Sequence, residues 1–205
     1  MKKIFVMIVI FLSLFIINCN SYFKIIQKGL SSYVINPVEK ELRTIEGKYY
    51  IVFPPDGENW HYCKDDYFAV FFKNYDEQNH SLHLVIKTYI MDCDIGSKEE
   101  FIRYQTNRIN GYNKEKYSWI NEEYVNLEKY GEFSINYKLH AIEKDYKKVN
   151  YGEKFHINEN RIIFINLKHP KICYEISCIE YYKKYAKDIN SDIIFENFLN
   201  KITIK

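Results

Sequence analysis

Two short histidine-containing segments are the closest groupings of metal-ligating residue types in this sequence: HSLH at residues 80–83 and HYC at residues 61–63. In an extended strand, side chains alternate between the two faces, so His80 and His83 would point in opposite directions, whereas His61 and Cys63 would share a face. Two ligands are fewer than the four that a structural zinc site uses. The spacing therefore predicts no metal site, and we expect no cofactor.

The signatures of the common catalytic classes do not occur in the sequence. It has no G-x-S-x-G turn, no Walker A loop, no G-x-G-x-x-G loop and no H-E-x-x-H segment. Acidic pairs such as Glu99-Glu100 and Glu122-Glu123 are present. A catalytic pair of carboxylates is defined by separation and environment, which spacing along the chain does not supply. We therefore expect a protein that is not an enzyme, with no catalytic residue to name.

Aromatic and basic residues interleave in one segment, Tyr181-Tyr182-Lys183-Lys184-Tyr185. This combination stacks on bases or sugars and contacts anionic headgroups. The alternative is a strand that ends in a basic loop, in a chain that has 20 tyrosines. We treat the segment as the candidate interaction patch.

Four of the five cysteines are candidates for disulfides: Cys63, Cys93, Cys173 and Cys178. An even number in an exported chain allows up to two bonds, in three complete pairings. We expect Cys63 to pair with Cys93, and Cys173 with Cys178. Residues five apart on a straight strand are roughly 16 Å apart, too far for a disulfide. The second pair therefore needs a bulge or a turn, and free buried thiols are the alternative.

The fifth cysteine, Cys19, follows a segment with the composition of a signal peptide. Residues 1–18 begin with Lys2 and Lys3 and continue with an apolar run over 4–17, interrupted only by Ser13. The run is shorter than the about 20 apolar residues of a membrane-spanning helix. Ordinary cleavage and an uncleaved anchor are the alternatives to lipid attachment at Cys19.

The end of this run, Ile16-Ile17-Asn18-Cys19, resembles a bacterial lipobox, although Asn18 stands where Gly, Ala or Ser is usual. The resemblance implies cleavage before Cys19 and lipid attachment to its thiol. Two or three acyl chains on that residue would hold the protein stably at a membrane. We therefore expect an exported bacterial lipoprotein, at the periplasmic face of a membrane or at the cell surface.

Net charge argues against nucleic acid as a partner. Removal of residues 1–18 takes away Lys2 and Lys3, which leaves 27 basic and 27 acidic residues. A domain that binds a polyanion usually has a basic excess or stripe. Only seven Gly and four Pro are present, which argues against a disordered chain, and the remaining length suits a single domain.

Local signals predict three helices. Asn36-Pro37-Val38-Glu39 has an N-cap residue, a first-turn proline and a glutamate at N3, which predicts a short helix to about residue 46. Ser97-Lys98-Glu99-Glu100 is a capping box before a helix over 98–110, which Gly111 ends. A last helix is expected over 192–201, capped by Asn190 or Ser191.

Strands account for most of the rest of the chain. Aromatic and β-branched runs predict them at 49–53, 67–73, 82–91, 117–128, 133–143, 161–167 and 172–182, with an edge strand at 202–204. In the fifth of these, Ile135, Tyr137 and Leu139 alternate with polar residues, which is typical of a half-buried antiparallel strand.

This layout resembles the PsbP-like family. The features that carry the resemblance are a strand ending in Phe53-Pro54-Pro55 and followed by Trp60, the Ser-capped helix from Ser97, a strand near Gly131, and a hairpin over 161–182 before a closing helix. The resemblance implies an α+β fold in which helices flank an antiparallel sheet. We expect one such domain over residues 47–205, after a lipidated cysteine, tether and short helix over 19–46. Known members mostly act as accessory or adaptor proteins, and no functional residue carries over.

We therefore expect an exported, lipid-anchored envelope or surface protein that acts as a non-catalytic binding or interaction module. Its expected partners are the membrane, through Cys19, and another envelope or extracellular protein. The first alternative is an envelope-associated hydrolase with a dispersed, motif-free active site, which would need a concave pocket with at least two convergent titratable groups. The second is a structural envelope component without a small ligand.

Overall fold

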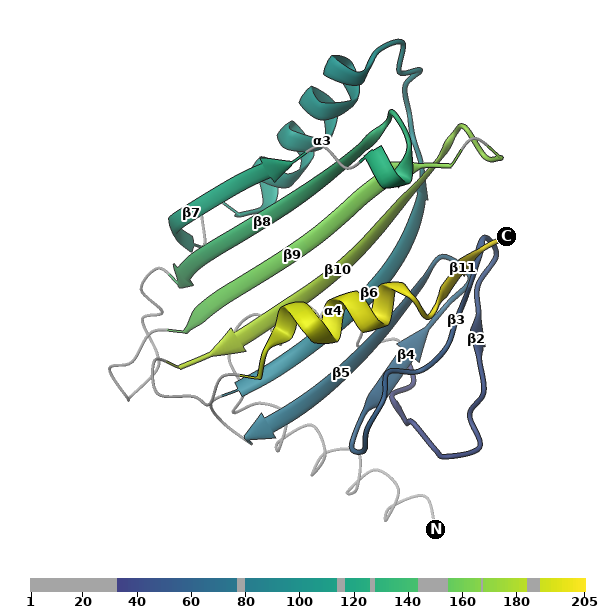
Figure 1. Ribbon diagram of the computed structural model, residues 1–205, viewed down its shortest axis with the longest axis vertical. Coiled ribbons are helices and arrows are strands. Elements are labelled where there is room, and N and C mark those ends of the chain that lie inside the picture. The colour runs from purple at the N-terminus through teal and green to yellow at the C-terminus, as the bar shows by residue number, and fades with distance from the viewer. Residues whose placement is uncertain are drawn as a thin grey trace, which may run out of the picture. The chain divides into compact units, whose positions relative to one another are not determined.

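An eight-stranded antiparallel sheet organises the chain (Figure 1), with the strand order β1-β4-β5-β6-β10-β9-β8-β7. The strands are β1 Asn36–Pro37, β4 His61–Lys64, β5 Phe68–Asp76, β6 His80–Ile90, β7 Tyr117–Val125, β8 Ser134–Glu143, β9 His156–Ile165 and β10 Ile172–Tyr182. A second sheet has the order β11-β3-β2, from β2 Ile45–Glu46, β3 Tyr50–Val52 and β11 Ile202–Ile204. Among the described residues, the helices are α3 Lys98–Asn113 and α4 Ser191–Leu199, with a 3₁₀ turn, η1, at Glu128–Tyr130.

The computed structural model describes residues 33–76, 80–113, 117–125, 128–143, 155–166, 168–183 and 189–205. The chain divides into two compact units, Met1–Ile35 and Asn36–Lys205, and the fold described here is that of the second unit. The predicted signal segment, Cys19 and the first part of the tether lie outside the described residues. No helix within the described ranges is long and apolar enough to cross a membrane.

Strand β10 lies at the centre of the sheet, and its sequence explains why. All of its residues except Tyr182 are buried, because it has neighbours on both sides and covered faces above and below. Its neighbour β6 pairs with it along eleven residues, from Ile90 opposite Ile172 to His80 opposite Tyr182. Strand β8 has the predicted alternation: Ile135, Tyr137, Leu139 and Ala141 are buried, and the residues between them are half-buried or exposed.

Helix α4 covers one face of the sheet and crosses β6 and β10 (Figure 1). Phe195 and Phe198 are almost completely buried against this face, and the ring of Phe198 meets Phe71 edge to face at 5.8 Å between centroids. The three-stranded sheet completes the cover, because Tyr50 and Val52 of β3 belong to the same hydrophobic core. This α4 face therefore contains the main core of the domain.

Helix α3 packs on the opposite face, near β8. It buries Phe101, Gln105 and Ile109. The predicted capping box is confirmed, because Ser97 Oγ accepts from the backbone N–H of Glu100 at 3.2 Å, and Glu100 Oε2 accepts from the N–H of Gly96 at 2.8 Å. The helix begins at Lys98, as predicted, but the predicted end is wrong, because α3 continues through Gly111 to Asn113.

The expected fold class is wrong. The described chain is mostly β, with eleven strands in two sheets and two α-helices, rather than an α+β sandwich with helices flanking the sheet as in the PsbP-like arrangement. The physical reason lies in the cover of the α4 face: a second, small sheet shares with one helix the apolar surface that a layer of helices was expected to cover.

The predicted helix over 36–46 is also wrong. Asn36 and Pro37 instead pair with Tyr62 and His61 of β4, and Ile45 and Glu46 pair with β3. An N-cap residue contributes only about 0.5–2 kcal/mol, and long-range strand pairing outweighs such local signals here. Ile45 is buried in the core as a strand residue.

Candidate functional site

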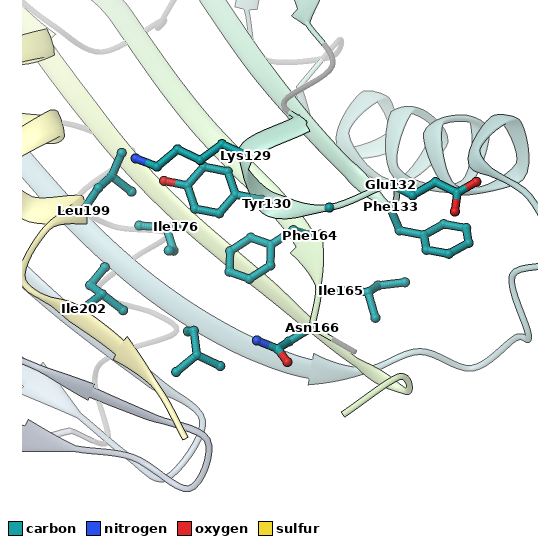
Figure 2. Close-up of a pocket in the computed structure, with 12 residues that line it drawn as sticks. Lys129, Tyr130, Glu132, Phe133, Phe164, Ile165, Asn166, Ile176, Leu199 and Ile202 are labelled. Carbon is teal, nitrogen blue, oxygen red and sulfur yellow. The ribbon is translucent and has the colours of Figure 1, made fainter. Parts of the chain in front are cut away.

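An apolar pocket of about 450 Å³ opens on the α4 face (Figure 2). Phe164 of β9 and Ile176 of β10 contribute from the large sheet, Tyr130 from η1, and Leu199 and Ile202 from the chain that leaves α4. The complete lining is Lys129, Tyr130, Gly131, Glu132, Phe133, Phe164, Ile165, Asn166, Ile176, Leu199, Ile202 and Ile204. Elements from both sheets and from α4 thus build its walls.

Stacked aromatic rings stiffen one side of this apolar pocket. The ring of Tyr130 lies 5.0 Å from that of Phe164, at an interplanar angle of 28°. The ring of Phe164 in turn lies 5.2 Å from Tyr174, almost parallel to it. Stacked pairs at these separations add to the energy of burial. Burial also raises the pKa of Tyr130, so its hydroxyl is neutral at physiological pH.

Lys129 and Glu132 are the charged residues among those that line the apolar pocket. The Nζ atom of Lys129 lies 5.5 Å from the centroid of the Tyr130 ring. In Figure 2 Lys129 extends alongside the Tyr130 ring toward Leu199, whereas Glu132 lies at the end nearer α3. The pocket can hold an apolar group against the sheet, with the positive charge of Lys129 at the end of the pocket near Leu199.

A second, polar pocket of about 200 Å³ lies along β7, β8 and β9, next to the start of α4. Its lining consists of Asn121, Glu123, Lys138, Leu139, His140, Asn158, Glu159, Asn160, Cys178, Ser191 and Asp192. Strand register explains the convergence: Asn121 of β7 pairs with His140, His140 with Asn158, and Asn158 with Glu180 of β10. One row across the sheet therefore places four polar residues on a single face.

A buried hydrogen-bonded group adjoins the polar pocket. His80 Nε2 lies 2.8 Å from Glu180 Oε1, and both residues are buried. Ser191 Oγ, at the first position of α4, donates to Glu180 Oε2 at 2.9 Å, and Asn158 Nδ2 donates to the same oxygen at 3.4 Å. The carboxylate thereby ties α4 to three strands of the sheet.

The two side chains in the polar pocket that could act as nucleophiles, Cys178 and Ser191, are poorly suited to nucleophilic catalysis. Burial raises the pKa of the Cys178 thiol far above its ordinary value, and the carboxylates of Glu180, Asp192 and Glu159 raise it further, so the reactive thiolate is scarce. The Ser191 hydroxyl donates a hydrogen bond to the carboxylate of Glu180 rather than to a histidine base. The pocket has the two or more titratable groups that a hydrolase would need, but no activated nucleophile of the usual kind.

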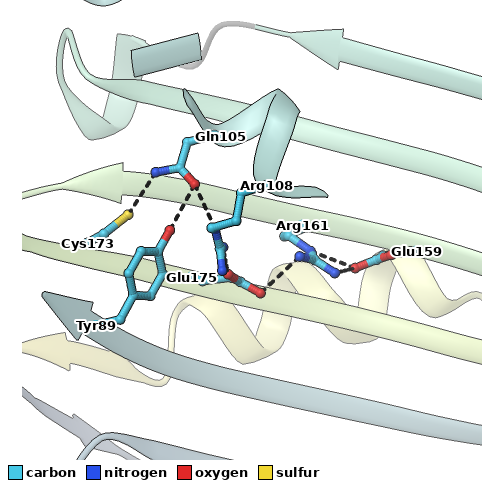
Figure 3. A network of polar contacts seen from close by, with 7 residues as sticks. All are labelled: Tyr89, Gln105, Arg108, Glu159, Arg161, Cys173 and Glu175. Carbon is cyan, nitrogen blue, oxygen red and sulfur yellow. Dashed lines mark hydrogen bonds and ion pairs between the residues drawn. The ribbon is translucent and has the colours of Figure 1, made fainter. Parts of the chain in front are cut away.

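A buried ionic network lies on the other face, beneath α3 (Figure 3). Both guanidinium groups, from Arg108 of α3 and Arg161 of β9, contact the carboxylate of Glu175 on β10, and Arg161 also contacts Glu159. Gln105 accepts from Tyr89 at 2.8 Å. These contacts link α3 to strands β9 and β10 of the sheet.

The charge state of Glu175 follows from its neighbours. Burial alone would raise the pKa of its carboxyl, but Arg161 and Arg108 outweigh that cost and lower the pKa to about 2. The glutamate is therefore ionised throughout the physiological range. Next to it, burial raises the pKa of the Cys173 thiol to about 12, and the sulfur accepts a hydrogen bond from Gln105 at 3.5 Å.

The histidine segments found in the sequence do not come together. His61 is exposed and stacks on Phe72, and Cys63 is buried. His80 contacts Glu180 on the α4 face, while His83 meets Tyr181 on the opposite one. Among the residues that the structure describes, no group of three or more His, Cys, Asp or Glu side chains could hold a metal ion.

Neither of the expected disulfides is formed, because all four cysteines are free thiols. Cys173 and Cys178 lie an odd number of residues apart on the regular strand β10, so they point to opposite faces of the sheet. Cys178 belongs to the α4-face core, whereas Cys173 contacts Gln105 of α3. Cys63 is buried in β4, and Cys93 is exposed after β6.

The candidate interaction patch is split by the same alternation. Tyr181 is buried beside His83, and Tyr182 faces His156 on the other side, with its ring 5.3 Å away. Lys183 lies over the Phe155 ring at 5.7 Å. Lys184 and Tyr185 lie outside the described residues, so the two tyrosines and Lys183 are the part that can be placed, and the tyrosines do not share a surface.

Sequence reasoning did not bring the residues of the polar pocket together; for possible chemistry it considered only Glu123, in an acidic pair, and Cys178, as a candidate for a disulfide. The pocket residues come from β7, β8, β9, β10 and α4, and no short motif joins them. One signal was present in β9, where His156, Asn158 and Asn160 alternate and place three polar side chains on one face. Tyr130 and Gly131, by contrast, lie between the strands predicted at 117–128 and 133–143, and Gly131 has a φ of 98°.

A comparison of the chain with protein-family models gave no match, and a comparison with curated proteins gave none either. The two pockets and their chemistry are therefore the basis for a functional hypothesis.

Proposed function

We propose that this chain is an exported protein held at a bacterial membrane or cell surface by lipid on Cys19, and that its folded domain is a non-catalytic binding module. The observation that carries the proposal is the apolar pocket on the α4 face. Apolar walls with a few polar groups at the margin are typical of small-ligand sites. The lipid at Cys19 would keep this site close to the membrane.

The ligand that suits this pocket is a small amphiphile with an apolar body and an acidic or strongly polar head. A volume of about 450 Å³ lies within the range of about 300–1,000 Å³ usual for small-molecule sites. The apolar body would lie on Phe164 and Ile176, and the head would lie near Lys129. This chemistry favours a small ligand over the envelope protein expected as a partner from the sequence.

Binding of a fluorescent fatty acid tests the proposal. The chain from Asn20 onward, which lacks the signal segment and the lipid, is titrated with cis-parinaric acid. We expect saturable binding at one site per chain. Leu199 is a half-buried residue of the pocket wall, and Leu199→Trp should fill the cavity. We expect binding to weaken at least about tenfold, because each methylene group excluded from the pocket removes about 0.8 kcal/mol of binding free energy.

The matched control lies on the same helix. Ile193 of α4 is 54% exposed and is not part of the pocket lining, so Ile193→Trp adds the same indole without filling the cavity and should bind as the wild type does. Lys129→Ala should weaken binding of the fatty acid but not binding of the corresponding fatty alcohol. A wild-type chain that does not bind the probe, or equal losses in both tryptophan variants, would refute the pocket as the binding site.

A further inference from the structure

Two imidazoles meet at the edge of the polar pocket. His140 of β8 and His156 of β9 are neighbours on the α4 face, and His140 Nε2 lies 3.3 Å from His156 Nδ1. At this separation one imidazole can donate a hydrogen bond to the other when one of the two nitrogens carries a proton, although the distance is longer than the most common value of about 2.9–3.0 Å. Two nitrogen ligands of a tetrahedral metal ion, each bound at about 2.0–2.1 Å, lie about 3.3 Å apart. The distance thus fits two ligands of one ion.

The position of both rings is set by the fold rather than by a flexible loop. The residues are diagonal neighbours on adjacent strands. His140 pairs with Asn158 and His156 pairs with Ile142, so the two histidines are offset by two residues in register. The ring of His156 stacks on Tyr182 with centroids 5.3 Å apart and an interplanar angle of 25°. A ligand pair on rigid strands needs little reorganisation to bind a metal ion.

The surroundings favour a bound cation. The lining of the polar pocket includes the carboxylates of Glu123 and Asp192 and one ammonium group, that of Lys138; a third carboxylate, Glu159, contacts Arg161. His140, but not His156, lines this pocket of about 200 Å³, so water molecules in the pocket can reach the His140 side of the pair.

We propose that His140 and His156 bind one divalent transition-metal ion, with the remaining coordination positions open to water or to a donor from a partner. Imidazole ligands suit Zn²⁺, Cu²⁺ and Ni²⁺, whereas Mg²⁺ and Ca²⁺ prefer oxygen ligands. The site is separate from the apolar pocket, and it does not depend on the amphiphile proposed there. It also differs from the histidine segments singled out in the sequence, because its two ligands lie 16 residues apart.

Copper binding to the full-length chain tests this site directly. The protein is purified in detergent without a polyhistidine tag, and Cys93, the exposed thiol, is replaced by serine to remove a competing ligand. Titration with Cu²⁺ should show one site per chain, and pulsed electron paramagnetic resonance should count two imidazole ligands. Mg²⁺ should not compete. A copper spectrum with one imidazole, or with none, overturns the proposal even if every variant fails to fold.

Variants assign the two ligands. His140→Gln and His156→Gln should each weaken Cu²⁺ and Zn²⁺ binding at least about tenfold, the lower bound seen when even an outer-shell partner of a metal ligand is removed. His61→Gln is the control, because His61 is exposed and stacks on Phe72 of the other face, and it should leave affinity unchanged. Thermal unfolding in the presence of chelator checks that each variant is folded. Unchanged affinity in both folded variants refutes the site.

Discussion

Arg161 and Glu175 form an ion pair inside the domain, with Nη1 of the arginine 3.0 Å from Oε1 of the glutamate. The side chains are 14% and 9% exposed. Arg108 contacts the other oxygen of the same carboxylate from α3. One carboxylate thus contacts two guanidinium groups and links the helix to the sheet. Its removal would leave the Arg108 guanidinium without a carboxylate partner and Arg161 with Glu159 alone.

Replacement of this carboxylate should therefore be strongly destabilising. Glu175→Leu is expected to lower the free energy of unfolding by about 3–5 kcal/mol, the usual cost of breaking a buried pair by removing one partner. Urea denaturation followed by circular dichroism measures the change. Asp94→Asn is the control, since the pair between Lys171 and Asp94 is 75% and 96% exposed and such pairs contribute at most about 1 kcal/mol. Equal, small losses in both variants would contradict a stabilising role for the network.

His83 should make the free energy of unfolding depend on pH in the mildly acidic range. Burial lowers the pKa of its imidazole from 6.5 to about 4. The unfolded chain therefore takes up this proton at a higher pH than the folded one, and the stabilisation that is complete above about pH 6.5 is lost as pH falls toward 4. The loss from this residue amounts to about 3 kcal/mol over that window.

The variant His83→Leu should flatten this dependence. Urea denaturation at pH 7 and pH 4.5 would show a smaller drop in the free energy of unfolding for the variant than for the wild type. His140 contributes in the same direction, because its pKa is also lowered, so part of the drop should remain. Glu175 acts at lower pH, between about 4.5 and 2. An identical drop in wild type and variant would show that His83 does not titrate as its burial requires.

Gly47 is required by close packing. A Cβ atom at this position would lie 2.3 Å from Cε1 of Tyr50 and 2.9 Å from the backbone oxygen of Asp66. Tyr50 is fully buried, so its ring cannot move aside freely. Gly47→Ala should cost about 1–3 kcal/mol, seen as a lower midpoint of thermal unfolding. Gly96→Ala is the matched substitution, because its Cβ would meet only the end of the Glu100 side chain, at 3.3 Å. Similar midpoints for the two variants would contradict the packing argument.

Lipid attachment to Cys19 is tested at the mature N-terminus. Mass spectrometry of the protein expressed in a bacterium that processes lipoproteins should find Cys19 as the first residue, with the added mass of its acyl chains. Cys19→Ser should abolish the added acyl mass, because serine has no thiol to which the lipid could be attached. A mature chain that begins at Asn20, or an unmodified Cys19, would refute lipidation.

Much of the strand and helix content could be predicted from local patterns. Strand β10 covers Ile172–Tyr182 and β11 covers Ile202–Ile204, both as predicted. The helix α3 begins at Lys98 after a capping box that needs only residues 96–100. These signals succeed because helix caps and side-chain alternation depend on neighbours along the chain.

The first strands could not be predicted in this way. β1 and β2 have two residues each, and β4 has four, which is too short for a periodic pattern. The pairing of Asn36 with Tyr62 joins segments that are distant in sequence, and a favourable local helix signal at residue 36 gave the opposite expectation. Long-range strand pairing outweighed the local helix propensity there. As a result, residues 36–37 and 45–46 add strands to the two sheets instead of forming a helix.

By itself, the sequence determined which segments form most of the strands and helices and which side of β8 is apolar, because each depends on residues a few positions apart. Tertiary structure decided the rest. Register across β7, β8, β9 and β10 placed Asn121, His140, Asn158 and Glu180 in one row, and the return of the chain after α4 closed the apolar pocket over Phe164 and Ile176. Both pockets depend on the alignment of distant segments, which only the packing of the whole domain specifies.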